Sequence, residues 1–101
     1  MSVIKITKEN FTDEVLNSSK TVLLDFYADW CGPCRMVGPI VAEISEQRDD
    51  VKVGKINVDE QPELANRFNV MSIPMLAVIK GGKLVNQAIG YRPKEDIESM
   101  L

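Results

Sequence analysis

The chain has 101 residues and a net charge of −3, from 12 basic and 15 acidic side chains that are interspersed along the sequence. This length suits one domain over residues 1–101, and the lack of a basic patch or tail argues against partners such as nucleic acid or an anionic membrane. The apolar runs are too short to span a bilayer, and the first residues do not resemble a signal peptide, so we expect a cytoplasmic protein.

The first part of the chain predicts a strand, a helix and a second strand. Residues 3–6 read as a short strand, and Thr7 is a candidate N-cap for a helix over residues 8–17. Residues 21–28 are apolar on both faces except at Asp25, which is typical of a central strand that is covered on both sides.

The middle of the chain continues this alternation. Apolar residues recur at helical spacing over residues 31–47, and Pro39 inside this helix predicts a kink. Residues 51–58 read as the next strand. Asp59 is a candidate cap for a short helix with Pro62 in its first turn.

The last part predicts a hairpin and a final helix. Strands over residues 75–80 and 84–90 flank Gly81-Gly82, a pair that fits a two-residue turn, and Pro93 looks like the start of the last helix. The whole order predicts an α/β domain, with a central mixed five-stranded sheet flanked by four helices.

Both cysteines lie where the second strand gives way to a helix, in the stretch Trp30-Cys31-Gly32-Pro33-Cys34. Because the two cysteines are three residues apart at a helix start, both can occupy its first turn. The helix N-terminus favours the thiolate of Cys31, the nucleophilic form of the side chain. The chemistry that this spacing favours is thiol–disulfide exchange, in which Cys31 attacks a partner disulfide and Cys34 then resolves the mixed disulfide.

Three other interpretations of the cysteine pair need no redox activity. A structural disulfide at this spacing closes too small a loop to stabilise the fold much. A zinc site needs about four ligands, and the chain has only these two cysteines and no histidine. Two inert core cysteines would leave the intervening Gly-Pro unexplained.

The stretch from Phe26 to Met36 closely resembles the active site of the thioredoxin family, and the resemblance extends over the whole chain. Residues 55–59, residues 72–74 and Gly90 fall where thioredoxins carry similar segments. The resemblance implies a thioredoxin fold with a redox-active Cys31–Cys34 disulfide. It also implies protein-disulfide reductase activity as an electron carrier, thioredoxin reductase as electron donor and disulfide-containing proteins as targets. We expect a monomer. We also expect no cofactor, since no Gly-rich nucleotide loop follows a strand.

Asp25 is a carboxylate in a strand that is covered on both faces, so burial should raise its pKa. The residues alone leave two roles open. Asp25 accepts the proton of Cys34 during resolution, or it is a buried acid that is satisfied by Lys55 on a neighbouring strand. The resemblance favours the first role, because the matching aspartate of thioredoxins is assigned proton transfer and the matching lysine lies near it.

By the same resemblance, Pro74 is a cis-proline that faces the two cysteines and lets the Ile73 backbone pair with an extended peptide. Met36 and Met71 read as core residues or as incidental exposure, with soft contacts on a docking surface as the alternative. A flat, mostly apolar patch for partner docking is expected from Trp30, Gly32, Pro33, Val58, Ile73, Pro74, Ile89 and Gly90.

Two residues depart from the usual thioredoxin pattern. Tyr27 replaces a common tryptophan, and Met75 replaces the threonine that usually follows the proline, which puts the polar detail of the substrate groove in question. Two other functions remain open, a disulfide oxidase or isomerase, and a binding subunit in which the sulfurs do not matter. Gly32-Pro33 between the cysteines matches the reducing members of the family.

Overall fold

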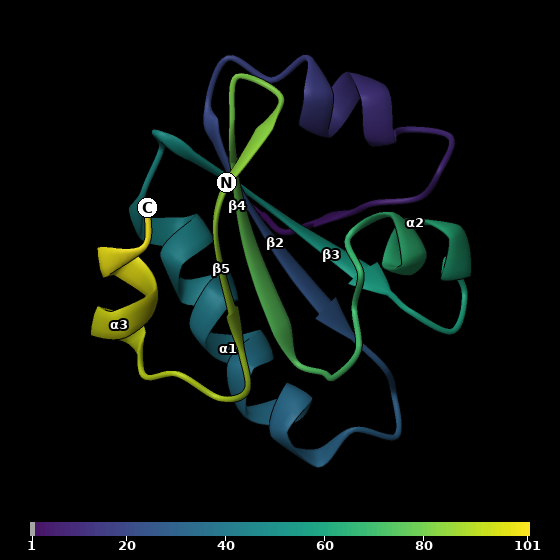
Figure 1. Cartoon of the computed structure of the whole chain (residues 1–101). Coiled ribbons are helices and arrows are strands. Elements are labelled where there is room, and N and C mark those ends of the chain that lie inside the picture. The colour runs from purple at the N-terminus through teal and green to yellow at the C-terminus, as the bar shows by residue number, and fades with distance from the viewer. Residues whose placement is uncertain (1) are drawn as a thin grey trace.

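The computed structural model describes residues 2–101, and its centre is one five-stranded sheet (Figure 1). The strands lie in the order β1-β3-β2-β4-β5. The elements in chain order are β1 (Ile4–Lys5), the π-helix η1 (Thr12–Leu16), β2 (Thr21–Tyr27), α1 (Gly32–Gln47), β3 (Val51–Asn57), α2 (Pro62–Arg67), β4 (Met75–Lys80), β5 (Lys83–Ile89) and α3 (Lys94–Ser99). The predicted mixed five-stranded sheet with four helices is therefore confirmed within these residues.

Strand β2 is the middle strand, as its apolar sequence predicts. It pairs in parallel with β3, placing Asp25 opposite Lys55, and antiparallel with β4, placing Phe26 opposite Met75. Because β2 has a neighbour on each side and helices over each face, five consecutive residues from Val22 are buried. Only Ala28 and Asp29 separate the end of β2 from the cysteine stretch.

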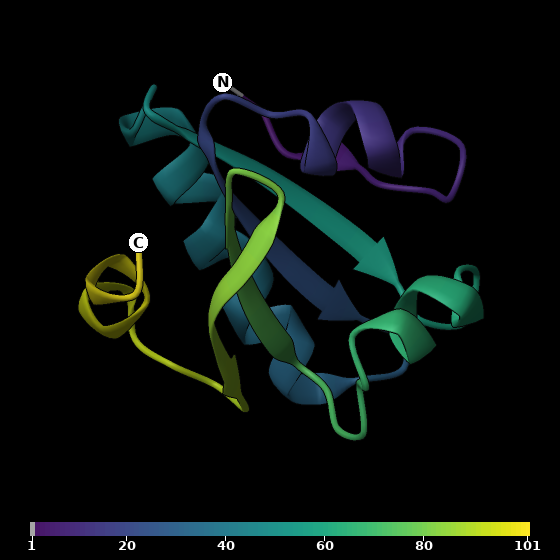
Figure 2. The same ribbon diagram turned by 45° about the horizontal axis from the view of Figure 1, so that its top comes forward.

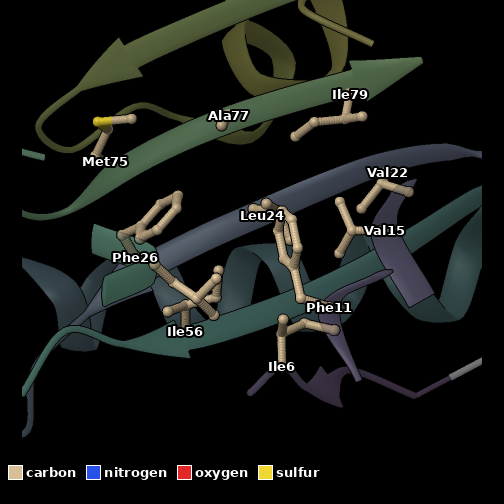
Figure 3. Packing of buried hydrophobic residues seen from close by; sticks show 11 residues of the cluster. Ile6, Phe11, Val15, Val22, Leu24, Phe26, Ile56, Met75, Ala77 and Ile79 are labelled. Carbon is tan, nitrogen blue, oxygen red and sulfur yellow. The ribbon is translucent and has the colours of Figure 1, made fainter. Parts of the chain in front are cut away.

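The helices form two layers, one on each side of the sheet (Figures 1 and 2). On one side, α1 and α3 pack with Val37, Val41, Ile44 and Ile97 against Leu23 and its neighbours. On the other side, η1 and α2 cover a second cluster. Figure 3 shows this cluster, which contains Ile6, Phe11, Val15, Val22, Leu24, Phe26, Ile56, Leu64, Met75, Ala77 and Ile79.

The first helix differs from its prediction in both start and type. Thr7 does not cap a helix, because its N–H donates to the Asn10 side-chain oxygen and its carbonyl accepts from the Asn10 N–H, which folds these residues into a turn. The helix begins at Thr12 instead, and the Asn17 N–H donates to the Thr12 carbonyl five residues back. The side-chain amide of Asn10, which also donates to the Lys5 carbonyl, competes with a regular helix at this point.

The hairpin between β4 and β5 turns at Gly81-Gly82, as predicted. Both residues have positive φ, 58° and 78°, which is the conformation that a tight two-residue turn between twisted strands requires. This hairpin places Ile89 opposite Met75, so that the end of β5 lies beside the start of β4. The segment that precedes β4 is the one that meets the cysteines.

Candidate functional site

The two cysteines form a disulfide at the N-terminus of α1. Cys31 is the N-cap residue with extended backbone, and the N–H of Cys34 donates to the Cys31 Sγ over 3.2 Å. Pro33 lies in the first turn, where its missing N–H costs no helical hydrogen bond. The sequence Cys-Gly-Pro-Cys therefore folds into a helix start that brings the two Cα atoms to 5.3 Å.

The sulfur-bearing residues are buried in spite of their place at the edge of the fold. Cys31 is 4% exposed and Cys34 is 5% exposed, and both pack with Ala28. Val58 and Ile73 lie against this group from two other segments. Gly32 and Pro33, which lie between the two cysteines, are exposed.

Trp30 stands out from this buried group with 69% of its surface exposed. Its indole Nε1–H donates to Asp59 Oδ2 over 2.9 Å, which fixes the ring on the turn after β3. Buried Asn57 builds that turn, since its Oδ1 accepts the N–H groups of Asp59 and Glu60. The prediction that Asp59 caps a helix is wrong, because Gln61 is the N-cap of α2 and Asp59 holds Trp30 instead.

The Ile73–Pro74 peptide bond is cis, which confirms the prediction. Ile73 packs against the cysteine group, and the Pro74 carbonyl accepts the Gly90 N–H over 2.8 Å. Gly90 has φ of 91°, a conformation that side chains disfavour, and a Cβ there would meet nothing within 4 Å. Gly90 is thus placed next to the proline, with open space around its α-carbon.

A groove of about 380 Å³ opens beside Trp30. It contains three members of the predicted patch and four further residues, among them Met71, for which a soft surface contact is one of the readings from the sequence. The lining residues are Trp30, Val58, Ala65, Val70, Met71, Ser72 and Ile73. Met71 and Met36 are 88% and 58% exposed, so the core reading does not hold for either residue, and the alternative of exposure describes both. A sequence signal did exist for Met71, a large apolar residue in the loop directly before Ser72-Ile73-Pro74.

Ile89 belongs to a different hollow, on the side of the sheet that η1 and α2 cover. Together with Met75 and Phe68 it lines a cavity of about 350 Å³ there, away from the groove beside Trp30. Met75 is 2% exposed and packs into the core cluster that Figure 3 shows. The departure from threonine at this position therefore changes the core and leaves the lining of the Trp30 groove untouched.

Asp25 lies in the interior, next to a cavity of about 270 Å³. The cavity is lined by Val3, Asp25, Gly38, Val41, Ala42 and Lys55. Gly38 follows Cys34 by one helical turn, so the two share the face of α1 that looks toward this cavity. Within residues 2–101, Asp25 Oδ1 accepts no hydrogen bond, and no ion pair joins the carboxylate to Lys55.

Burial raises the pKa of Asp25 from 3.8 to about 7, and the positive charge of Lys55 only partly opposes this shift. The predicted direction is confirmed. Burial also raises the pKa of Tyr27, whose side chain hydrogen-bonds to that of Asn57. The hydroxyl that distinguishes Tyr27 from tryptophan thus supports the residue that builds the turn under Trp30.

Within residues 2–101, no helix is both long enough and apolar enough to cross a membrane.

Residues 2–101 match the thioredoxin family. The thioredoxin of Alicyclobacillus acidocaldarius subsp. acidocaldarius is 48% identical over 101 residues, which cover 99% of this chain and 95% of that protein. The thioredoxin of Pyropia yezoensis is 46% identical over 102 residues, which cover 100% of this chain and 95% of that protein. The thioredoxin of Listeria monocytogenes serovar 1/2a is 48% identical over 100 residues, with coverage of 98% and 95%. Together with the cysteine pair at the start of α1, these matches establish that the chain belongs to the thioredoxin family and is a redox carrier that works by dithiol–disulfide exchange.

Proposed function

We propose that the chain is a protein-disulfide reductase in which Cys31 is the attacking thiol and Cys34 the resolving thiol. The observation that carries these roles is the N-cap position of Cys31, whose sulfur accepts the Cys34 N–H. In the reduced protein the same N–H and the helix dipole stabilise a thiolate at Cys31. Cys34 lies inside the first turn, where its sulfur can reach the Cys31 sulfur.

The exchange proceeds in two displacements. The Cys31 thiolate attacks one sulfur of the partner disulfide, the partner S–S bond breaks, and its other sulfur leaves as a thiolate. Cys34 then loses its proton and attacks the Cys31 sulfur, which releases the second partner thiolate and leaves the Cys31–Cys34 disulfide. Two electrons have moved to the partner, and a reductase must return two electrons to this chain.

Asp25 is the proposed acceptor of the Cys34 proton. Its pKa of about 7 means that it can take and release a proton near neutral pH, and its cavity borders the face of α1 that carries Cys34. The cavity has room for the water that would connect the two groups. Lys55, opposite Asp25, is proposed to limit the rise of that pKa through its charge.

Partner docking is proposed for Trp30, Gly32, Pro33, Ile73, Pro74 and Gly90, where buried Pro74 acts from beneath the surface by holding Gly90 through its carbonyl. An extended segment of the partner would pair with the Ile73 backbone, next to the cis bond. Its flanking apolar side chains would enter the groove beside Trp30. We further propose thioredoxin reductase as electron donor, a monomeric state and a cytoplasmic place of action.

Reduction of insulin by dithiothreitol tests the function and the two cysteine roles together. We expect the wild-type protein to accelerate reduction, Cys34→Ser to accumulate a mixed disulfide with insulin, and Cys31→Ser to form none. Asp25→Asn should form the mixed disulfide at the normal rate but resolve it more slowly. No acceleration by the wild type would refute the reductase proposal, and a mixed disulfide from Cys31→Ser alone would reverse the two roles.

A further inference from the structure

Met71 is an apolar side chain held out from the loop between α2 and β4. At 88% exposure it is the most exposed of the large hydrophobic residues within residues 2–101. A thioether in this position is open to reagents in solution, whereas most methionines of globular proteins are buried.

The side chain is also part of the groove beside Trp30. Met71 lines this groove together with Val58 and Ile73. Val58 and Ile73 in turn pack against Cys31 and Cys34, so the groove borders the disulfide itself. A chemical change at Met71 therefore changes the surface that a partner would meet next to the reacting sulfurs.

The other described methionines provide an internal comparison. Met36 is 58% exposed on α1 but is not among the residues that line the groove. Met75 is 2% exposed in the core, and Met100 is half-buried after α3. Met71 is therefore an accessible methionine in the groove, Met36 is an accessible methionine outside it, and Met75 is a protected one.

We propose that Met71 is a site of oxidation by hydroperoxides, and that its oxidation lowers the affinity of the Trp30 groove for apolar partner segments. This inference rests on the proposed docking function of the groove. The thioether sulfur gives two electrons to the peroxide, the O–O bond breaks, an S=O bond forms, and water leaves when the oxidant is hydrogen peroxide. The product is a sulfoxide, which is polar where the thioether was apolar.

A docked partner would cover the new oxygen, and a covered polar group without a hydrogen bond weakens binding. The Trp30 side chain, which lines the same groove, does not supply that bond, because its indole N–H is already donated to Asp59. The expected effect is therefore on binding, with the exchange chemistry at the cysteines unchanged.

The first experiment maps the oxidation. The protein is treated with hydrogen peroxide in its disulfide form, so that the cysteines are protected, and its peptides are analysed by mass spectrometry over time. Met71 should gain oxygen first and Met36 second, while Met75 stays unmodified. The site assignment is overturned if Met71 is oxidised no faster than Met75.

The second experiment measures the consequence. Each protein is compared with its own untreated sample in the reduction of a disulfide peptide that carries apolar residues next to its cysteines. Oxidation of the wild type should raise KM by about 5-fold or more, with kcat unchanged. Met36→Leu should show the same rise, and Met71→Leu should show none, because leucine is apolar but has no sulfur to oxidise.

An equal rise in Met71→Leu, or a fall of kcat without a change of KM, would overturn the proposed effect on binding. Failure of the proposed function is recognised separately, since the untreated wild-type protein would then not reduce the peptide or insulin at all. The map of oxidised methionines does not depend on either activity.

Discussion

Asp25 and Lys55 lie directly opposite each other on the parallel strands β2 and β3, and yet no ion pair joins them. The carboxylate is 3% exposed, and its Oδ1 accepts no hydrogen bond within residues 2–101. Lys55 therefore acts on Asp25 only through the electrostatic effect of its positive charge, which lowers the pKa of the carboxyl. The alternative of a buried acid satisfied by direct contact with Lys55 does not describe this pair.

The first prediction concerns the pH dependence of stability. The folded pKa of Asp25 is about 7, and the ordinary value is 3.8, so between these pH values the unfolded chain binds fewer protons at this group. The free energy of unfolding should therefore fall as pH rises from about 4 to about 7, by up to about 4 kcal/mol, and change no further through this group above that range. Well below pH 4 the carboxyl is neutral in both states and contributes no such cost.

Urea unfolding followed by circular dichroism at several pH values measures this effect. The free energy of unfolding of the wild type, relative to that of Asp25→Asn, should fall between about pH 4 and about pH 7. The variant should therefore be the more stable protein at pH 8. Asp29→Asn, which removes an exposed carboxylate of the same chain, serves as control. A difference curve for Asp25→Asn as flat as that of the control would contradict the prediction.

The second prediction concerns the support of Trp30. Asp59→Ala removes the acceptor of the indole N–H, and because this hydrogen bond is exposed, the loss of stability should stay within about 1 kcal/mol. The ring should become more mobile and KM for protein disulfides should rise. Fluorescence anisotropy of the single tryptophan and insulin-reduction kinetics report these two effects.

Glu60→Ala provides the matched control, since Glu60 is an exposed neighbour that pairs with Lys5 and makes no bond to Trp30. Asp59→Asn keeps an acceptor oxygen and should restore most of the anisotropy. Equal effects of Asp59→Ala and Glu60→Ala would show that charge, rather than the hydrogen bond, is responsible.

The third prediction compares two glycines. A Cβ at Gly54 would lie 2.6 Å from Ile6 Cγ1 and 3.1 Å from Leu24 Cδ2, so Gly54→Ala should destabilise the fold by about 1–3 kcal/mol. A Cβ at Gly38 would meet nothing within 4 Å, and Gly38→Ala inside α1 should stabilise by about 0.5–1 kcal/mol. Urea unfolding of both variants at one pH tests the pair, and a stabilised Gly54→Ala would show that the Ile6 and Leu24 side chains move away at no cost.

The fourth prediction concerns the hairpin turn. Gly81→Ala and Gly82→Ala both force a side chain to positive φ, at a cost of roughly 1 kcal/mol each. Gly82→Ala should cost more, because its Cβ would lie 3.0 Å from the Leu16 carbonyl oxygen, while a Cβ at Gly81 meets nothing within 4 Å. Thermal unfolding should rank the variants in that order. Equal losses would mean that the end of η1 yields to the added methyl group.

Local patterns in the sequence predicted much of the fold. The apolar run that became β2, the Gly81-Gly82 turn and the helical spacing after Cys31 each depend on residues that are close in the chain, and each prediction is confirmed. The cis bond at Pro74 was predicted from family resemblance alone, because nothing local specifies it.

The features that were missed depend on contacts between distant residues or on competing side-chain bonds. Asp59 binds Trp30 across 29 positions, and no local pattern distinguishes this role from that of a helix cap. Asn10 converts the predicted helix start at Thr7 into a turn, because its side chain accepts the Thr7 N–H and donates to the Lys5 carbonyl. For Met71 the sequence leaves core, incidental exposure and surface contact open, because the apolar character of the residue does not say which way its loop faces.

The burial of both cysteines beside an exposed tryptophan has a consequence for which disulfides can react with this protein. Because Cys31 is only 4% exposed, a collision alone does not bring a foreign disulfide to its sulfur. In the docking mode proposed above, the partner first places an extended segment beside Trp30 and Ile73, so that selectivity would arise from shape before any bond changes. We therefore expect partners with extended, locally flexible segments of many sequences to react, and proteins with inaccessible disulfides to stay oxidised.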